Sequence, residues 1–171
     1  LYSTSFIWPP GNYVIKLCAL DRVNPSREIY VSKDAGQNWQ MLLPLLFSFK
    51  CYTLADSYFS VLERSDSHSR GQYRRYNQEI SKISSYENTI LNTLDRIKEM
   101  CDQERERLKE TIRIKYLRER LKVSLKYCNQ KDVELFSKKL TISDKLTFKE
   151  YLLKVVIKIP WLYLILRNLV L

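Results

Sequence analysis

The sequence predicts an α/β domain followed by an all-helical extension, on the basis of three observations. An apolar stretch at residues 38–50 has the spacing of a buried helix. Residues 52–62 are rich in aromatic and β-branched side chains, which favour extended structure. From Gly71 onward the sequence contains no further glycine, and apolar residues recur at helical spacing. We therefore place the first domain at residues 1–100 and the helical extension at residues 101–171.

The composition is that of a folded, basic protein. Of the 171 residues, 45% are hydrophobic, which is enough to bury a core and argues against general disorder. The 29 basic and 19 acidic residues give a net charge of +10, which favours nucleotide diphosphates, nucleic acid or an anionic membrane as partners. The four cysteines are scattered without a C-x-x-C pair, so we expect reduced thiols in the cytoplasm and no zinc site.

Turn residues break the N-terminal part of the chain into short apolar runs. Two prolines and a glycine predict a turn after the first run. Residues Tyr13–Leu17 fit either a short strand or the start of a helix. Asn24–Arg27 predicts a second turn, and Ile29–Val31 fits a short strand after it.

The segment Gly36-Gln37-Asn38-Trp39-Gln40 precedes a strongly apolar run and predicts a loop that enters a buried helix at residues 38–50. Such a helix would hold the polar side chains in fixed positions. Trp39 has two interpretations, because it could stack on a sugar or base or belong to the core. Pro44 should lie in the first turn or bend the helix. The expected buried face consists of Met41, Leu42, Leu45, Leu46 and Phe49.

A second polar segment, Arg64–Arg70, contains two arginines, three serines, an aspartate and the only histidine of the chain. Arginine can bind a pyrophosphate through two hydrogen bonds, and serine can donate to phosphate or sugar oxygens. A neutral imidazole, here His68, can ligate a divalent metal. The alternative interpretation of this segment is a polar surface turn.

The order and spacing of four segments, Pro25–Tyr30, Gly36–Gln40, Leu42–Pro44 and Arg64–Ser69, resemble the second half of a bacterial family 2 glycosyltransferase domain. The resemblance covers roughly residues 13–97. Members of this family transfer a sugar from a nucleotide-sugar donor to an acceptor hydroxyl, usually with a divalent metal. The resemblance implies a GT-A type α/β fold. It also places the family's metal-binding Asp-x-Asp and nucleotide-binding strands upstream, so we expect this sequence to be a fragment that is inactive alone.

The resemblance assigns catalytic positions to Gln37 and Asn38. The family usually has a Glu-Asp pair there, and its aspartate acts as the base on the acceptor hydroxyl. A neutral amide can orient that hydroxyl by hydrogen bonding but cannot deprotonate it. Either another group is therefore the base, or this branch of the family uses a different arrangement.

The resemblance also implies a donor and acceptor site. The second polar segment would close over the donor diphosphate, and a divalent metal, Mg or Mn, would assist, with His68 as its candidate ligand. The site residues implied in this way are Trp39, Arg64, Ser67, His68 and Ser69.

Two amphipathic helices are predicted after Gln72. The first should lie on the preceding domain through Tyr76, Ile80, Ile83, Ile90, Leu94, Ile97 and Cys101. The second, between Cys101 and Cys128, is highly charged, and its interleaved glutamates argue against nucleic-acid binding. Its expected ion pairs are Glu106/Lys109, Glu110/Arg113, Lys115/Glu119 and Glu119/Lys122. Its apolar stripe, which requires a packing partner, is Leu108, Ile112, Leu117, Leu121 and Leu125.

The C-terminal stretch predicts a short helix at Lys131–Leu140 and another at Lys145–Ile159, capped by Thr141–Asp144. Tyr151–Leu171 is too apolar for a solvated tail, yet its three cations and one proline argue against a membrane span. We expect it to lie in the membrane interface, with Trp161 and Tyr163 at the boundary. The alternative is that this tail packs against the domain.

These observations together predict a glycosyltransferase that uses a nucleotide-sugar donor and a saccharide or lipid-linked acceptor in surface polysaccharide synthesis. We expect it at the inner face of the cytoplasmic membrane as a peripheral protein that does not bind nucleic acid. The alternative function is a membrane-associated helical interaction protein without enzymatic activity.

Overall fold

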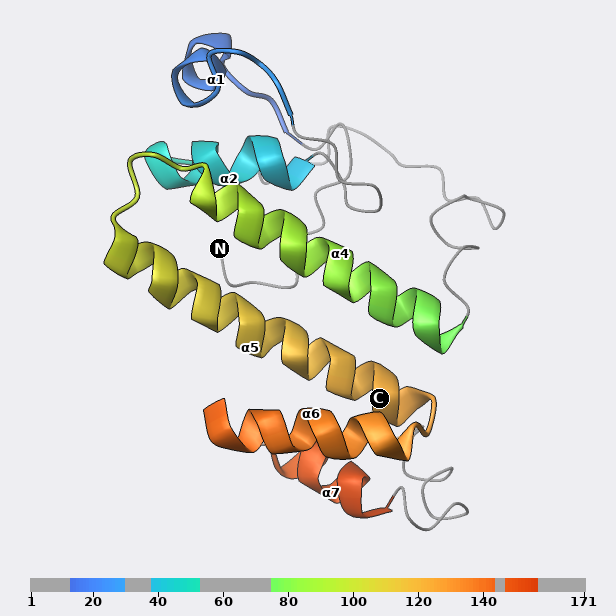
Figure 1. Cartoon of the computed structure of the whole chain (residues 1–171). Helices are drawn as coiled ribbons and strands as arrows, with labels where there is room; N and C mark the ends of the chain where they lie inside the picture. The colour runs from blue at the N-terminus through green and yellow to red at the C-terminus, as the bar shows by residue number, and fades with distance from the viewer. Residues whose placement is uncertain (1–12, 30–37, 53–74, 144–146, 157–171) are drawn as a thin grey trace.

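The computed structural model describes residues 13–29, 38–52, 75–143 and 147–156. Within these ranges the elements are all helices (Figure 1). In chain order they are α1 (Leu17–Val23), α2 (Asn38–Ser48), α4 (Tyr76–Asp95), α5 (Asp102–Lys126), α6 (Gln130–Ser143) and α7 (Phe148–Val156).

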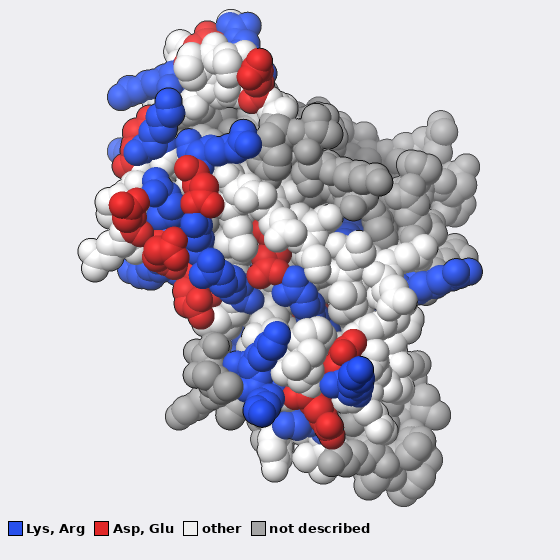
Figure 2. Space-filling model, viewed as in Figure 1, with Lys and Arg blue, Asp and Glu red and all other residues white. Residues whose placement is uncertain are grey.

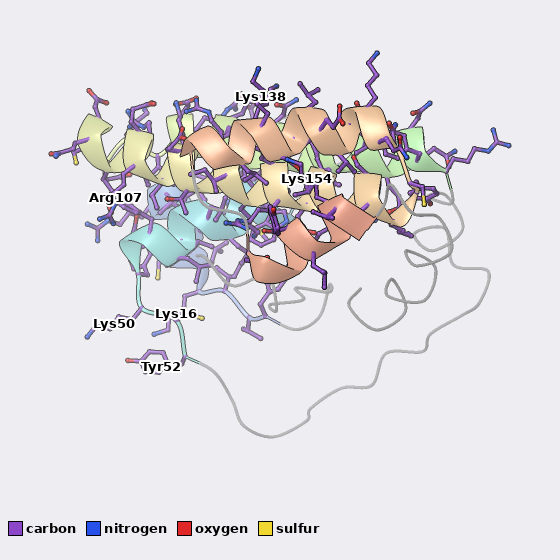
Figure 3. All side chains as sticks on the ribbon, turned by 90° about the horizontal axis from the view of Figure 1, so that it is seen from below. Lys16, Lys50, Tyr52, Arg107, Lys138 and Lys154 are labelled. Carbon is purple, nitrogen blue, oxygen red and sulfur yellow. The ribbon has the colours of Figure 1, made fainter. Side chains whose placement is uncertain are left out.

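The helices α4, α5 and α6 run antiparallel and lie side by side as one layer (Figure 1). Helix α2 packs against α4, and α7 packs against α5. Both α2 and α7 lie on the same side of the layer, whereas Lys138 of α6 points away from the other side (Figure 3). Helix α1 contacts α2 and extends the structure at one end. The molecule therefore has one face that is partly covered by short helices and one that is open.

The prediction of an α/β fold is wrong, because the described residues are mainly helical and contain no strand. Residues 13–16 are not extended into a strand, and a helix begins at Leu17. Ile29 is not in a strand either, while the rest of the expected strands at 29–31 and 52–62 falls largely outside the described residues. β-branched and aromatic residues form strands only where a neighbouring strand supplies hydrogen bonds and packing. The domain division at residue 100 stays a prediction.

The core consists of two clusters of buried side chains that share α5. One cluster lies between α4, the α4–α5 turn and α5, and contains Leu94, Ile97, Met100 and Leu108, with Phe47 of α2 and Ile112 packed against it. The other lies between α5 and α6 and contains Leu121, Leu125, Val133 and Leu140. The residues predicted as one apolar stripe on α5 are therefore divided between two partners: Leu108 and Ile112 pack toward α4, whereas Leu117, Leu121 and Leu125 pack toward α6. Each buried leucine contributes about 1.5–3 kcal/mol through its removal from water.

Helix α4 ends at Asp95, before the predicted Cys101, and Arg105 of α5 stabilises this end. Its guanidinium donates to the carbonyl oxygens of Leu94 (3.3 Å), Ile97 (3.0 Å) and Met100 (2.8 Å). These carbonyls lie at and beyond the last turn of α4, where intrahelical donors are missing and the helix dipole favours a cation. Arg105 therefore fixes the turn that brings α4 and α5 together.

Polar contacts join the start of α4 to the α5–α6 turn. The Tyr76 hydroxyl donates to the Asp132 carboxylate and lies 3.0 Å from the Ser124 Oγ. The Glu79 carboxylate accepts from Lys126 Nζ (2.6 Å) and from the Tyr127 hydroxyl (2.7 Å). These contacts hold α4 against the end of α5 and the start of α6. We call the group the polar clamp; its members are Tyr76, Glu79, Ser124, Lys126, Tyr127 and Asp132.

Charged side chains cover much of the α4–α5–α6 face, where acidic and basic residues are interspersed (Figure 2). Three predicted ion pairs of α5 are confirmed: Glu106/Lys109 at 3.2 Å, Glu110/Arg113 at 3.6 Å and Glu119/Lys122 at 2.8 Å. The fourth, Lys115/Glu119, does not form an ion pair, since the Glu119 carboxylate binds Lys122 instead.

Helix α7 begins with a capping box that is different from the predicted cap. The Thr147 N–H donates to Glu150 Oε2 (2.8 Å), and the Glu150 N–H donates to Thr147 Oγ1 (3.3 Å). Arg118 of α5 also donates to Glu150 Oε2 (2.6 Å). The cap predicted at residues 141–144 is wrong, because Ser143 is the last residue of α6. The Arg118–Glu150 ion pair thus attaches α7 to the layer.

Candidate functional site

The start of α2 holds the first of the predicted site residues in a defined position. Asn38 is the first residue of α2, and its Oδ1 accepts a hydrogen bond from the Tyr13 hydroxyl at 2.9 Å. The buried residues Leu42, Leu43 and Leu45 anchor this helix in the core. Because the helix cannot rotate without exposing these leucines, the Asn38 amide has a fixed orientation.

Gln40 is the most unusual polar residue of this region. Its side chain is only 9% exposed, and neither its amide nitrogen nor its amide oxygen has a hydrogen-bond partner. Leaving a buried amide unsatisfied costs about 1–3 kcal/mol. Pro44, which lies inside α2 beyond the first turn, has no N–H for the Gln40 backbone carbonyl. Gln40 is therefore retained at a cost in stability.

A small pocket of about 40 Å³ lies between α2, α4 and α5. Its lining is mostly apolar and comes from Leu43 of α2, Ile90 and Leu94 of α4, and Leu108 and Ile112 of α5. The remaining lining residues are Trp39, Thr111, Lys115 and Tyr116. Trp39, the aromatic residue of the predicted segment Gly36–Gln40, thus forms part of a pocket wall together with residues of α5 that lie about seventy positions later in the chain.

Two residues of α5 give this pocket its electrostatic character. Burial lowers the pKa of Lys115, and the negative charge of Glu119 partly opposes this effect. The Lys115 ammonium lies 5.6 Å from the centre of the Tyr116 ring. Burial, together with the nearby charge of Glu87, raises the pKa of Tyr116 to about 12. At neutral pH the pocket therefore presents a partly buried cation and a protonated phenol.

Two carboxylates of this region, Glu87 and Glu119, form ion pairs with residues other than Lys115. Glu87 of α4 is buried and forms an ion pair with Arg120, whose guanidinium also donates to Ser84 Oγ (3.1 Å). Glu119 binds Lys122, as described above. Among the described residues, no carboxylate oxygen lies within ion-pair distance of Lys115 Nζ.

Only two of the predicted site residues lie in the described part of the chain. Asn38 begins α2, and Trp39 follows it with its side chain in the pocket wall, a position compatible with both interpretations made from the sequence. The others fall outside the described residues, so their roles stay predictions: Gln37, Arg64, Ser67, His68 and Ser69.

The expected metal ligand His68 is among the residues that the structure does not describe. In the described ranges, no group of three or more His, Cys, Asp or Glu side chains could hold a metal ion. The metal prediction therefore rests on the sequence resemblance alone.

Sequence reasoning missed Gln40, Lys115 and Tyr116. The sequence predicts an ion pair between Lys115 and Glu119, because Glu119 follows Lys115 by four residues. A signal for its actual position is present, however. Residues three and four positions apart share one side of a helix, which places Lys115 and Tyr116 next to the inward-facing Ile112.

None of the helices described here is long and apolar enough to cross a membrane. Comparisons with protein families, curated proteins and solved structures found no match for this chain.

Proposed function

We propose that this chain is part of a glycosyltransferase that moves a sugar from a nucleotide-sugar donor to a hydroxyl of a saccharide or lipid-linked acceptor. The sequence resemblance supports this proposal through the order and spacing of its two polar segments. One structural observation carries it further: Asn38 begins a helix that is anchored by buried leucines, and Tyr13 holds its amide oxygen. A side chain fixed in this way can orient a substrate hydroxyl.

In the proposed reaction, the acceptor oxygen forms a bond to the anomeric carbon of the donor sugar while the bond from that carbon to the diphosphate oxygen breaks. The acceptor proton passes to a base. Asn38 cannot be this base, because a neutral amide does not accept a proton near pH 7. We therefore assign Asn38, with Gln37, to positioning the acceptor. We assign Arg64, Ser67, His68 and Ser69 to the donor diphosphate, where Mg or Mn would neutralise developing charge.

The test is nucleoside diphosphate release by the purified product of the complete open reading frame. The reaction would contain Mg or Mn, a panel of UDP- and GDP-sugars, and either wild-type protein or Asn38→Ala. We expect metal-dependent release that falls about tenfold to a hundredfold in Asn38→Ala, the range for loss of a positioning contact. Asn92→Ala, an exposed asparagine of α4, is the matched control and should keep full activity. No release or binding of any donor would contradict the proposal.

The second candidate function is a helical interaction protein without enzymatic activity. The mainly helical architecture of the described residues favours it, as does the exposure of Leu135, Tyr151 and Val155 on α6 and α7. The two candidates differ in nucleotide-sugar binding. Calorimetry that detects no heat with the complete protein and the donor panel would favour the interaction protein.

We also propose peripheral association with the inner face of the cytoplasmic membrane. Tyr151 and Val155 are 58% and 48% exposed, lie four residues apart on α7, and support an outward apolar edge on this helix. The net charge of +10 would favour anionic lipids. Co-sedimentation with phosphatidylglycerol vesicles should weaken when residues 151–171 are deleted. Equal pelleting of both proteins would reject the association.

A further inference from the structure

We propose that the pocket between α2, α4 and α5 binds an alkyl phosphate, with its first methylene groups in the apolar interior and its phosphate at Lys115. The observations that carry this inference are the lining of the pocket, the chemistry of its polar groups and the missing counter-ion of Lys115. The inference does not depend on the proposed glycosyl transfer.

The interior of the pocket is apolar and small. Its volume of about 40 Å³ exceeds the roughly 10–15 Å³ that a cavity needs to hold one water molecule. That space suits a short aliphatic segment. The leucine and isoleucine side chains of the interior offer no hydrogen bonds, so an apolar group is preferred to water there.

The polar groups of the lining are suited to an anion. The Lys115 ammonium and the Trp39 indole N–H can only donate hydrogen bonds, and the Tyr116 phenol remains protonated at neutral pH. The Thr111 hydroxyl donates to the Arg107 carbonyl (2.9 Å), and its oxygen can still accept. None of the lining residues in the described part of the chain is a carboxylate.

Lys115 differs from the neighbouring cations because no carboxylate of the residues that the structure describes pairs with it. Lys109 contacts Asp95 (2.5 Å) and Glu106, and Arg118 contacts Glu150. A partly buried cation without a counter-ion is unfavourable, and a bound anion would relieve that cost. A phosphate next to an alkyl group satisfies both the cation and the apolar interior, whereas a free phosphate satisfies only the cation.

The first test is an NMR titration of the full 171-residue chain with monobutyl phosphate, observed at the Trp39 indole N–H. The signal can be assigned by its loss in Trp39→Phe. We expect saturable shifts with monobutyl phosphate and at least tenfold weaker binding of both inorganic phosphate and butanol. Equal affinity for butanol, or equal affinity for inorganic phosphate, would overturn the proposal.

Variants of Lys115 test the charge. Lys115→Gln should weaken monobutyl phosphate binding at least tenfold, whereas Lys115→Arg, which keeps the charge, should retain most of it. Lys138→Gln removes the same charge from the opposite face of the layer and should leave the affinity unchanged (Figure 3). Thermal unfolding of each variant verifies its fold. Unchanged affinity in folded Lys115→Gln, or equal loss in Lys138→Gln, would contradict the assignment.

The phosphate could belong to a membrane lipid or to a soluble alkyl phosphate, and a vesicle experiment distinguishes these sources. If the source is a membrane lipid, phosphatidylglycerol vesicles should shift the equilibrium of the chain toward the bound form and compete with monobutyl phosphate. If it is soluble, binding of monobutyl phosphate should be unaffected by the vesicles. Either result supports the proposed pocket chemistry if Lys115→Gln weakens the binding at least tenfold. Binding that is unchanged in Lys115→Gln would contradict it.

Discussion

The α2 side of the molecule and the polar clamp differ in whether their buried polar groups have partners within the protein. In the clamp, the Tyr76 hydroxyl and the Glu79 carboxylate each have protein partners. On the α2 side, within the described ranges, the Gln40 amide has no hydrogen-bond partner and Lys115 of α5 has no counter-ion. Paired polar groups specify how helices pack, whereas unpaired ones lower the stability and gain no hydrogen bond or ion pair within the protein. The comparison therefore separates a structural region from one that is suited to binding.

The largest loss of unfolding free energy is expected when the ion pair between Glu87 of α4 and Arg120 of α5 is broken. Glu87→Ala leaves the partly buried Arg120 without its carboxylate, and should lower the free energy of unfolding by about 3 kcal/mol. Urea denaturation measures the change. Glu99→Ala, at an exposed position in the α4–α5 turn, is the control. A loss under about 1 kcal/mol, the value typical of an exposed ion pair, would show that this contact is not structural.

Removal of one clamp hydroxyl should have a smaller effect. Tyr76→Phe deletes the hydrogen bonds to Asp132 and Ser124 and should cost about 1–2 kcal/mol of unfolding free energy. The control is Tyr151→Phe, because Tyr151 is exposed. If both substitutions have the same small effect in urea denaturation, the clamp does not contribute to stability.

On the α2 side, removal of a buried polar group should raise the free energy of unfolding instead of lowering it. Gln40→Leu removes an unsatisfied buried amide and should raise the free energy of unfolding by about 1 kcal/mol. Gln103→Leu, at an exposed position of α5, should change it little. Destabilisation by Gln40→Leu of the size expected for Tyr76→Phe would remove the distinction between the two regions.

The smallest expected effect is a change in how stability depends on pH, through Glu150, which attaches α7 to α5. Although burial raises the pKa of Glu150, the hydrogen bonds from Thr147 and the ion pair with Arg118 lower it overall, below its ordinary value of 4.5. The native state therefore binds this proton less readily than the unfolded state. The resulting stability is present above pH 4.5 and is lost as the pH falls through the lowered pKa.

Glu150→Gln should accordingly lose less stability than wild type between pH 5 and pH 3, when thermal unfolding is followed across this range. Glu134→Gln, at an exposed position of α6, is the matched control. Parallel pH profiles for wild type and Glu150→Gln would show that the lowered pKa does not contribute to the acid response.

The helices after Gly71 could be predicted because their signal is local. The buried Leu121 and Leu125 follow a regular spacing on α5, and Glu119 and Lys122 pair within one turn. The end of α4 could not be predicted, because it depends on carbonyl contacts of Arg105 from the next helix. The α/β prediction failed because strand propensity has meaning only beside another strand.

The same distinction applies to the candidate site. The start of α2 at Asn38 was predicted from the apolar run that follows it, and this was confirmed. The pocket could not be predicted, since Trp39 and Lys115 are brought together only by the packing of α2 on the α4–α5 hairpin. Among the described residues Lys115 has no carboxylate partner, because Glu119 pairs with Lys122 on the same helix and Glu87 pairs with Arg120 between helices.

Hydrogen exchange of the full chain, with and without monobutyl phosphate, tests most directly whether binding and structure are divided between these two regions. We expect added protection in α2 and in residues 111–116 of α5, and no change in α6, which contributes no residue to the described lining of the pocket. Protection of α6 equal to that of α2, or no protection in α2, would contradict this division.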